Sequence, residues 1–137
     1  MSGWLANSLL ALACWGIWAF LPKLAVRHIS PRSAFLWEVV GGLVVGACVA
    51  ATLRERLGTD WRGVLPAVFT GVFGYLGVVF FLFALRTGQV SVVAPLSAVY
   101  PVITVALGVA LLGESLSGVQ IAGAVLALVG VALLSRG

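Results

Sequence analysis

Charged residues are scarce in this chain, and acidic residues are the scarcest. Only 9% of its 137 residues are charged, with four Asp plus Glu against eight Lys plus Arg. An average soluble domain is about 25% charged. The shortage excludes an ordinary water-facing surface over most of the chain. No basic face exists either, so we expect no nucleic-acid partner.

Residues that bind metals or perform catalysis are also rare. The chain has one histidine, His28, and two cysteines, Cys14 and Cys48, that both lie in apolar runs. Their spacing matches no metal site. The sequence has no Ser-His-Asp set, no Cys-His pair, no phosphate-binding loop and no pair of carboxylates on one helix. We therefore expect no metal, no cofactor and no enzymatic activity.

Apolar residues are correspondingly abundant. They make up 62% of the chain, against about 45–50% in a soluble domain. In lipid, every backbone polar group must be satisfied internally, which restricts the fold to helices or a closed barrel. A barrel strand alternates apolar and polar residues over about ten positions. The apolar runs here are continuous and longer, so the sequence predicts an all-α, polytopic membrane protein.

The apolar runs divide the chain into helices that are long enough to cross a bilayer, which takes about 20 residues. Ser30 before Pro31 is typical of a helix start, and Ser117 with Gln120 matches a capping box. The sequence predicts one transmembrane domain over residues 1–137 with helices at about 4–26, 32–53, 64–85, 91–112 and 118–135.

The basic residues flanking these helices give only a weak prediction of how the chain is oriented in the membrane. Five helices place the two termini on opposite faces, and the positive-inside rule compares the faces by their Lys and Arg. The N-terminal face carries Arg54, Arg56 and Arg62. The opposite face carries Lys23, Arg27, Arg32, Arg86 and Arg136. This weak bias is compatible with insertion of the chain in both orientations.

Several short motifs occur in a characteristic order along the chain. They are Trp15-Gly16, Ala84-Leu85-Arg86, Ala94-Pro95-Leu96, Tyr100-Pro101-Val102-Ile103-Thr104, Leu112-Gly113-Glu114-Ser115-Leu116-Ser117, Gln120, Gly123 and Val129-Gly130-Val131. Together with the predicted helices, this order resembles the EamA domain of the drug/metabolite transporter superfamily. The resemblance covers essentially the whole chain.

The resemblance implies half of a transporter. The usual member of that superfamily has two such domains in tandem as inverted repeats, and transporter sites lie between the repeats near the bilayer midplane. The resemblance therefore implies an antiparallel homodimer in the bacterial inner membrane. Such a dimer would move small metabolites or drug-like solutes, as an exporter or exchanger, by alternating access. Two alternatives stay open: a membrane subunit or half-transporter that pairs with a different chain, and a channel or flippase-like path.

The last predicted helix supplies candidates for the dimer contact. Gly123, Ala127 and Gly130 fall on one face of it, and small residues let membrane helices approach closely. By likeness to the last helix of four-helix relatives in the superfamily, this face is the candidate dimer seam.

Glu38 and Lys23 are the charged residues placed inside the predicted helices. Glu38 lies about six residues into the second helix, at a depth of roughly 9 Å. Lys23 lies just after Pro22, near the end of the first helix. Intramembrane charge is costly and marks candidate functional sites. Glu38 either neutralises Lys23 or Arg86, or binds a proton or a cationic group during transport. Lys23 either extends to the interface or faces a cavity.

Aromatic and hydroxyl side chains complete the candidate substrate site. Four aromatic residues carry a polar atom that requires a partner, and they are Trp15, Trp18, Trp37 and Tyr75. In the fourth helix, Pro101 frees a backbone carbonyl one turn earlier. That carbonyl, with Ser97, Tyr100 and Thr104, forms either a polar patch at mid-membrane depth or only a helix kink.

Overall fold

The computed structural model describes residues 3–54, 57–134 and 136. Two details of the predictions, the charge of Arg56 and the end of the last helix at residue 135, lie outside the described residues. Within them the chain is all-helical, with six helices: α1 (Gly3–Ala25), α2 (Pro31–Thr52), α3 (Trp61–Thr87), α4 (Val90–Ser97), α5 (Tyr100–Leu112) and α6 (Gly118–Leu134). The prediction of an all-α fold is confirmed.

Membrane-spanning length is reached by four segments. They are α1, α2, α3 and the stretch Val90–Leu112, which contains α4 and α5. The apolar helix α6 has 17 described residues, which corresponds to about 26 Å and to the lower end of the range for spanning helices. The chain is a polytopic membrane protein.

The fourth predicted helix is interrupted in its middle. Helix α4 ends at Ser97, Ala98 and Val99 form a turn, and α5 begins at Tyr100. Pro101 has no N–H to donate to the carbonyl of Ser97, one helical turn earlier, so the hydrogen-bond ladder cannot continue through this point. The chain restarts as α5 with Pro101 in its first turn, where a missing N–H costs least.

Local capping groups fix several helix ends, and the sequence predicted two of them. The Ser30 hydroxyl accepts from the Ser33 N–H at 3.2 Å and starts α2. At the start of α6, the Gln120 side chain accepts from the Ser117 N–H at 2.8 Å, and the Ser117 hydroxyl accepts from the Gln120 N–H at 3.3 Å. This reciprocal pair is the predicted capping box. Gly113 ends α5 with φ of 68°, a conformation that favours glycine.

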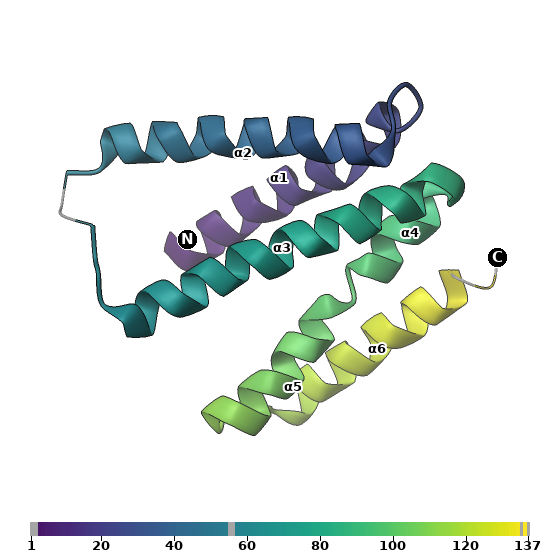
Figure 1. The fold of residues 1–137 in the computed structure, drawn as a ribbon. Helices are drawn as coiled ribbons and strands as arrows, with labels where there is room; N and C mark the ends of the chain where they lie inside the picture. The colour runs from purple at the N-terminus through teal and green to yellow at the C-terminus, as the bar shows by residue number, and fades with distance from the viewer. Residues whose placement is uncertain (1–2, 55–56, 135, 137) are drawn as a thin grey trace. The chain divides into compact units, whose positions relative to one another are not determined.

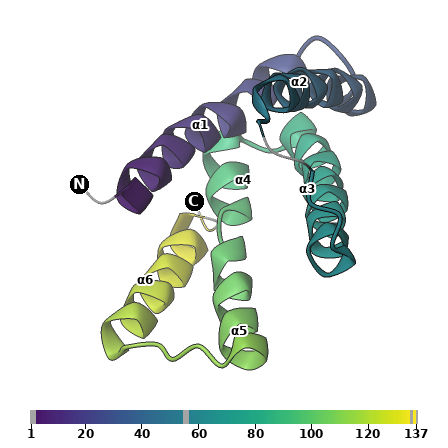
Figure 2. The same cartoon turned by 90° about the vertical axis from the view of Figure 1, so that its left-hand side faces the viewer.

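The chain divides into two compact units, residues 1–87 and residues 88–137. In the first unit, α1, α2 and α3 converge at the end where α1 turns into α2, and their opposite ends lie apart (Figures 1 and 2). The buried core sits at the convergent end and includes Leu82 and Leu85, which are 1% and 0% exposed. In the second unit, α4 contacts α6, and the loop 113–117 joins α5 to α6.

Candidate functional site

Glu38 on α2 is held by an indole from α1. The Trp18 Nε1 donates to the Glu38 Oε1 at 2.6 Å. Glu38 lies seven residues after the start of α2, and Trp18 lies seven residues before the end of α1, so each is about 10 Å from the end where the two helices meet. The convergence of the helices thus brings a carboxylate and an indole to the same depth in the membrane-spanning part.

The indole of Trp18 is fixed from a third helix. The ring of Phe81 on α3 stacks on it, with centroids 5.5 Å apart and planes at 15°. Phe81 is buried, whereas 39% of Trp18 remains exposed. The stack therefore covers one face of the indole and leaves part of the ring open. All three helices of the first unit contribute one side chain to this cluster of Trp18, Glu38 and Phe81, which we call the indole–carboxylate cluster.

Lys23 lies on α1 between Trp18 and the C-terminal end of that helix at Ala25. Its Nζ donates to the backbone carbonyl of Leu85 at 2.6 Å. Leu85 is in the last turn of α3, where carbonyls lack helical partners and the helix dipole favours a positive charge. Lys23 thus ties α1 to the C-terminal end of α3.

The polar partner of Glu38 is Trp18, and the described part of the chain shows no other hydrogen bond or ion pair to its carboxylate. An ion pair of Glu38 with Lys23 or Arg86 stays a prediction. So do the functional roles of these residues.

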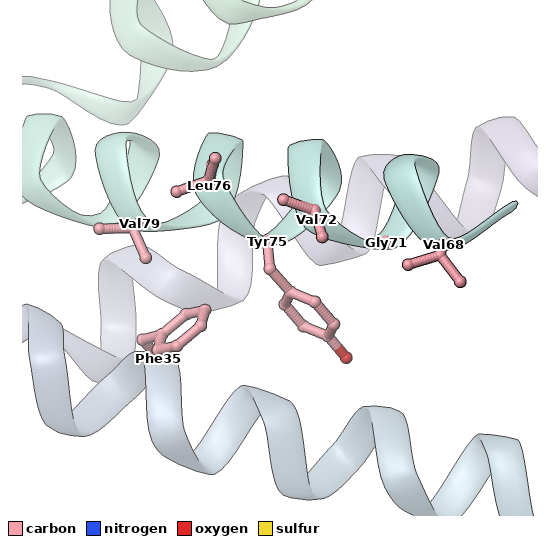
Figure 3. A pocket seen from close by; sticks show the side chains of 7 residues that line it. All are labelled: Phe35, Val68, Gly71, Val72, Tyr75, Leu76 and Val79. Carbon is pink, nitrogen blue, oxygen red and sulfur yellow. The ribbon is translucent and has the colours of Figure 1, made fainter. Parts of the chain in front are cut away.

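Tyr75 lies in a groove between α2 and α3, apart from the cluster. The groove has a volume of about 580 Å³ and is lined by Phe35, Val68, Gly71, Val72, Tyr75, Leu76 and Val79. Tyr75 points from α3 toward α2, beside Phe35 (Figure 3); the two rings meet edge to face with centroids 5.8 Å apart. The Tyr75 hydroxyl is the one polar side-chain atom in the lining, so the groove is almost entirely apolar.

The Tyr75 hydroxyl occupies the space that Gly42 leaves open on α2. A Cβ atom on Gly42 would overlap the Tyr75 Oη. Gly46, one turn later, has nothing within 4 Å of an added Cβ. Gly42 therefore allows the approach of an aromatic side chain from α3, whereas Gly46 faces open space.

Trp15 and Trp37 are aromatic candidates that the structure leaves outside both the cluster and the groove. They are 60% and 69% exposed. Among the described residues, neither ring makes a hydrogen bond or a ring contact.

The hydroxyl candidates of the second unit gather around the break between α4 and α5. Ser97 is the last residue of α4, and Tyr100 is the first of α5. Thr104 Oγ1 donates to the Tyr100 carbonyl at 3.5 Å. All three residues are exposed. The sequence pointed to this place through Pro101, and the structure adds that the helix is broken there rather than only bent.

A recess that the sequence did not indicate lies at the end of α5. It has a volume of about 310 Å³ and is lined by Thr104, Leu107, Gly108, Leu111, Leu112 and Glu114. The Glu114 carboxylate folds back over Gly108, where an added Cβ would lie 2.7 Å from the Glu114 Oε2. Glu114 thus acts as a local turn residue here, together with the left-handed Gly113.

The candidate dimer face on α6 is open in the single chain. Gly123, Ala127 and Gly130 are exposed, and an added Cβ on either glycine would have nothing within 4 Å. The dimer contact stays a prediction. The described residues also contain no group of three His, Cys, Asp or Glu side chains that would hold a metal ion.

Comparison with known proteins identifies the family to which the chain belongs. Residues 2–136 match the family described as "EamA-like transporter family". The chain is also similar to the "Uncharacterized protein MJ1333.1" of Methanocaldococcus jannaschii, at 32% identity over 129 residues. That match covers 93% of this chain and 92% of the relative, so the relative is about as long as this chain. No solved structure matches the chain.

Proposed function

Because the chain belongs to the EamA-like transporter family, we propose that it is a secondary transporter of small metabolites or drug-like solutes, acting as an exporter or exchanger. The family points to a transporter rather than to an enzyme. The protein would work in the cell membrane, which is the inner membrane in a bacterium. Its energy would come from an ion or solute gradient.

One observation supports this proposal most strongly: a carboxylate, Glu38, lies about 10 Å inside an apolar helix and has a single indole N–H as its polar partner in the described chain. A charge at this depth is costly and is expected to bind something. A purely structural carboxylate would be expected to have a close cation and more hydrogen bonds.

An antiparallel homodimer would supply the missing half of the transport path. The first unit is packed at one end and carries an open, apolar groove, so a single copy does not enclose a route for a solute. The archaeal relative has about the same length, since the match covers 92% of it. The nearly balanced basic residues at the helix ends support insertion in both orientations. Alternating access would come from rocking of one copy against the other.

Uptake by reconstituted protein tests the proposed transport function. Vesicles containing the purified full chain are given a pH gradient and screened with amino acids, amines, nucleobases and drug-like solutes. We expect saturable uptake of at least one class that collapses when the gradient is removed.

Glu38→Gln keeps the size of the side chain and an oxygen that accepts the Trp18 N–H, but removes the charge. We expect it to lower the initial uptake rate at least about tenfold, because the substrate or the coupling proton loses its charged partner. Glu114→Gln makes the same chemical change at a turn and should leave the rate unchanged. Uptake by Glu38→Gln at the wild-type rate would refute the role of Glu38, and absence of uptake for every solute class would refute the transport function.

A further inference from the structure

We propose that the groove between α2 and α3 holds one acyl chain of an anionic phospholipid, and that Arg32 and Arg86 bind the phosphate of that lipid. We call these two residues the arginine pair. The inference goes beyond the proposed transport function, and neither depends on the other. It is carried by the apolar lining of the groove, by the charges at one end of it and by the helical register that joins the two.

The groove offers a long apolar surface inside the membrane-spanning part of the first unit. Its lining runs along α3 from Val68 to Val79, with Phe35 of α2 opposite (Figure 3). This stretch of α3 is about 16 Å long, which is close to half of a hydrocarbon core of about 30 Å and thus to the depth of one leaflet. A lipid chain has the length and the apolar character that such a groove requires.

The arginine pair lies at the end of the unit where the helices converge. Arg32 is in the first turn of α2, Arg86 is in the last turn of α3, and both are exposed. Among the described residues, neither guanidinium makes a hydrogen bond or an ion pair. The described acidic residues of this unit are Glu38, about 9 Å further along α2 than Arg32, and Asp60, in the loop at the opposite end. The arginine pair is therefore available to an anion from outside the chain.

Helical register places the arginine pair in line with the groove. Arg32 is three residues before Phe35, so the two lie on the same side of α2. Arg86 is seven residues after Val79, which is about two turns further along the same side of α3. A chain that lies in the groove would therefore have its headgroup end beside both arginines.

A phospholipid brings an acyl chain and an anion to the membrane surface in one molecule. Arginine binds phosphate through two parallel hydrogen bonds, and basic pockets between transmembrane helices are typical sites for anionic headgroups. A zwitterionic lipid carries an ammonium group that the arginine pair would repel. A second copy of this chain in parallel orientation would bring the same two arginines to this end, and like charges at an interface are costly.

Competition between two lipids with identical chains tests the role of charge. The purified full chain in detergent is mixed with equal amounts of dioleoylphosphatidylglycerol and dioleoylphosphatidylcholine, and the bound lipid is identified by native mass spectrometry. We expect the anionic lipid to be retained at least about tenfold more often, because two basic residues favour it. An excess of inorganic phosphate, which has no chain, should not displace it.

Substitutions of arginine locate the headgroup. Arg32→Gln and Arg86→Gln each remove one guanidinium, and each should lower the preference for the anionic lipid about fivefold. Arg54→Gln makes the same change just beyond the opposite end of α2 and should leave the preference unchanged.

Two substitutions of glycine on α3 locate the chain. An added Cβ at Gly71 or at Gly74 meets nothing within 4 Å, but only Gly71 lines the groove. Gly71→Leu should therefore fill the groove and lower retention of the anionic lipid at least about fivefold, because the chain loses apolar contact. Gly74→Leu adds the same side chain outside the lining and should retain the lipid as the wild type does. Circular dichroism and elution volume establish that each variant is folded before retention is compared.

Equal retention of the two lipids by the wild type would overturn the inference. So would an unchanged preference in both arginine variants, or equal retention by Gly71→Leu and Gly74→Leu. Displacement by inorganic phosphate would also overturn it, because the arginine pair would then hold an anion without a chain. If Gly71→Leu instead shifts the elution volume from that of a dimer to that of a monomer, a second copy of the chain occupies the groove and the lipid site is wrong.

Discussion

Replacing Gly42 by alanine places a methyl group on α2 where the hydroxyl of Tyr75 lies. The Tyr75 ring is rigid, so its hydroxyl can yield only if the whole ring turns. Turning the ring disturbs its edge-to-face contact with Phe35, in which the centroids are 5.8 Å apart. Such aromatic contacts are worth about 0.5–1.5 kcal/mol, and overpacking costs about 1–3 kcal/mol. Because the clash involves the far end of a side chain, we expect a cost near the lower value, about 1 kcal/mol relative to Gly46→Ala, which gains the same helix propensity without a clash.

Two companion variants isolate the cause of this loss. In Gly42→Ala with Tyr75→Phe the clashing oxygen is gone, and the remaining ring carbon lies 3.7 Å from the new Cβ, an ordinary contact. We expect this double variant to regain most of the stability. Gly46→Ala adds the same methyl group in open space and should stabilise α2 slightly, because alanine favours a helix over glycine by about 1 kcal/mol.

The stability of the wild type and the three variants is compared by their midpoints of thermal unfolding in detergent. Unfolding is monitored as the loss of the monodisperse elution peak. We expect a lower midpoint for Gly42→Ala than for Gly46→Ala, recovery in the double variant and no loss in Gly46→Ala. The reasoning would be refuted if Gly42→Ala and Gly46→Ala had the same midpoint. It would also be refuted if Tyr75→Phe failed to rescue the Gly42→Ala protein.

Other predictions concern the ends of helices. Lys23→Met removes the bond to the Leu85 carbonyl and should destabilise the protein by about 1 kcal/mol, since hydrogen bonds from charged donors contribute about this much or more; an unchanged unfolding midpoint would contradict the tie between α1 and α3. Ser117→Ala removes half of the capping box with Gln120 and should cost about 1 kcal/mol, measured as a lower helical signal in circular dichroism on heating. Ser30→Ala should have a similar effect at the start of α2, and equal melting of both variants and the wild type would argue against the observed caps.

Features that depend on neighbouring residues in the sequence were predictable. The apolar runs located the helices because a bilayer demands continuous apolar length. The caps at Ser30 and Ser117 were predicted correctly because capping is decided within about four residues. The break between α4 and α5 was indicated by Pro101. The sequence did not show that the helix would stop and restart there, because a proline inside a helix either kinks or breaks it.

Contacts between helices could not be predicted from the sequence. Trp18 and Glu38 are 20 residues apart, and their pairing depends on how α1 and α2 are rotated about their axes. Both residues were candidates, but the hydrogen bond between them was not predicted. The stacking of Phe81 on Trp18 and the binding of Lys23 to the Leu85 carbonyl have no sequence pattern of their own. The approach of the Tyr75 hydroxyl to Gly42 likewise has no sequence pattern of its own.

The roles of Trp15, Trp37, Ser97, Tyr100 and Thr104 in binding a solute remain predictions. The same is true of the small-residue face of α6. In the proposed dimer the route across the membrane would lie between two chains, and its contacts would follow from the surfaces of two molecules rather than from the residues of one.

The central claim is that two copies of this chain lie in opposite orientations in one membrane. In a chain whose native Cys14 and Cys48 are replaced by alanine, single cysteines are placed at His28, in the turn between α1 and α2, and at Leu57, in the loop between α2 and α3. Intact cells are treated with a membrane-impermeant maleimide, and a permeant one then labels what remains. The account predicts that each position is labelled partly from outside and partly from inside. Labelling of His28→Cys from one side only, with Leu57→Cys labelled only from the other, would contradict it.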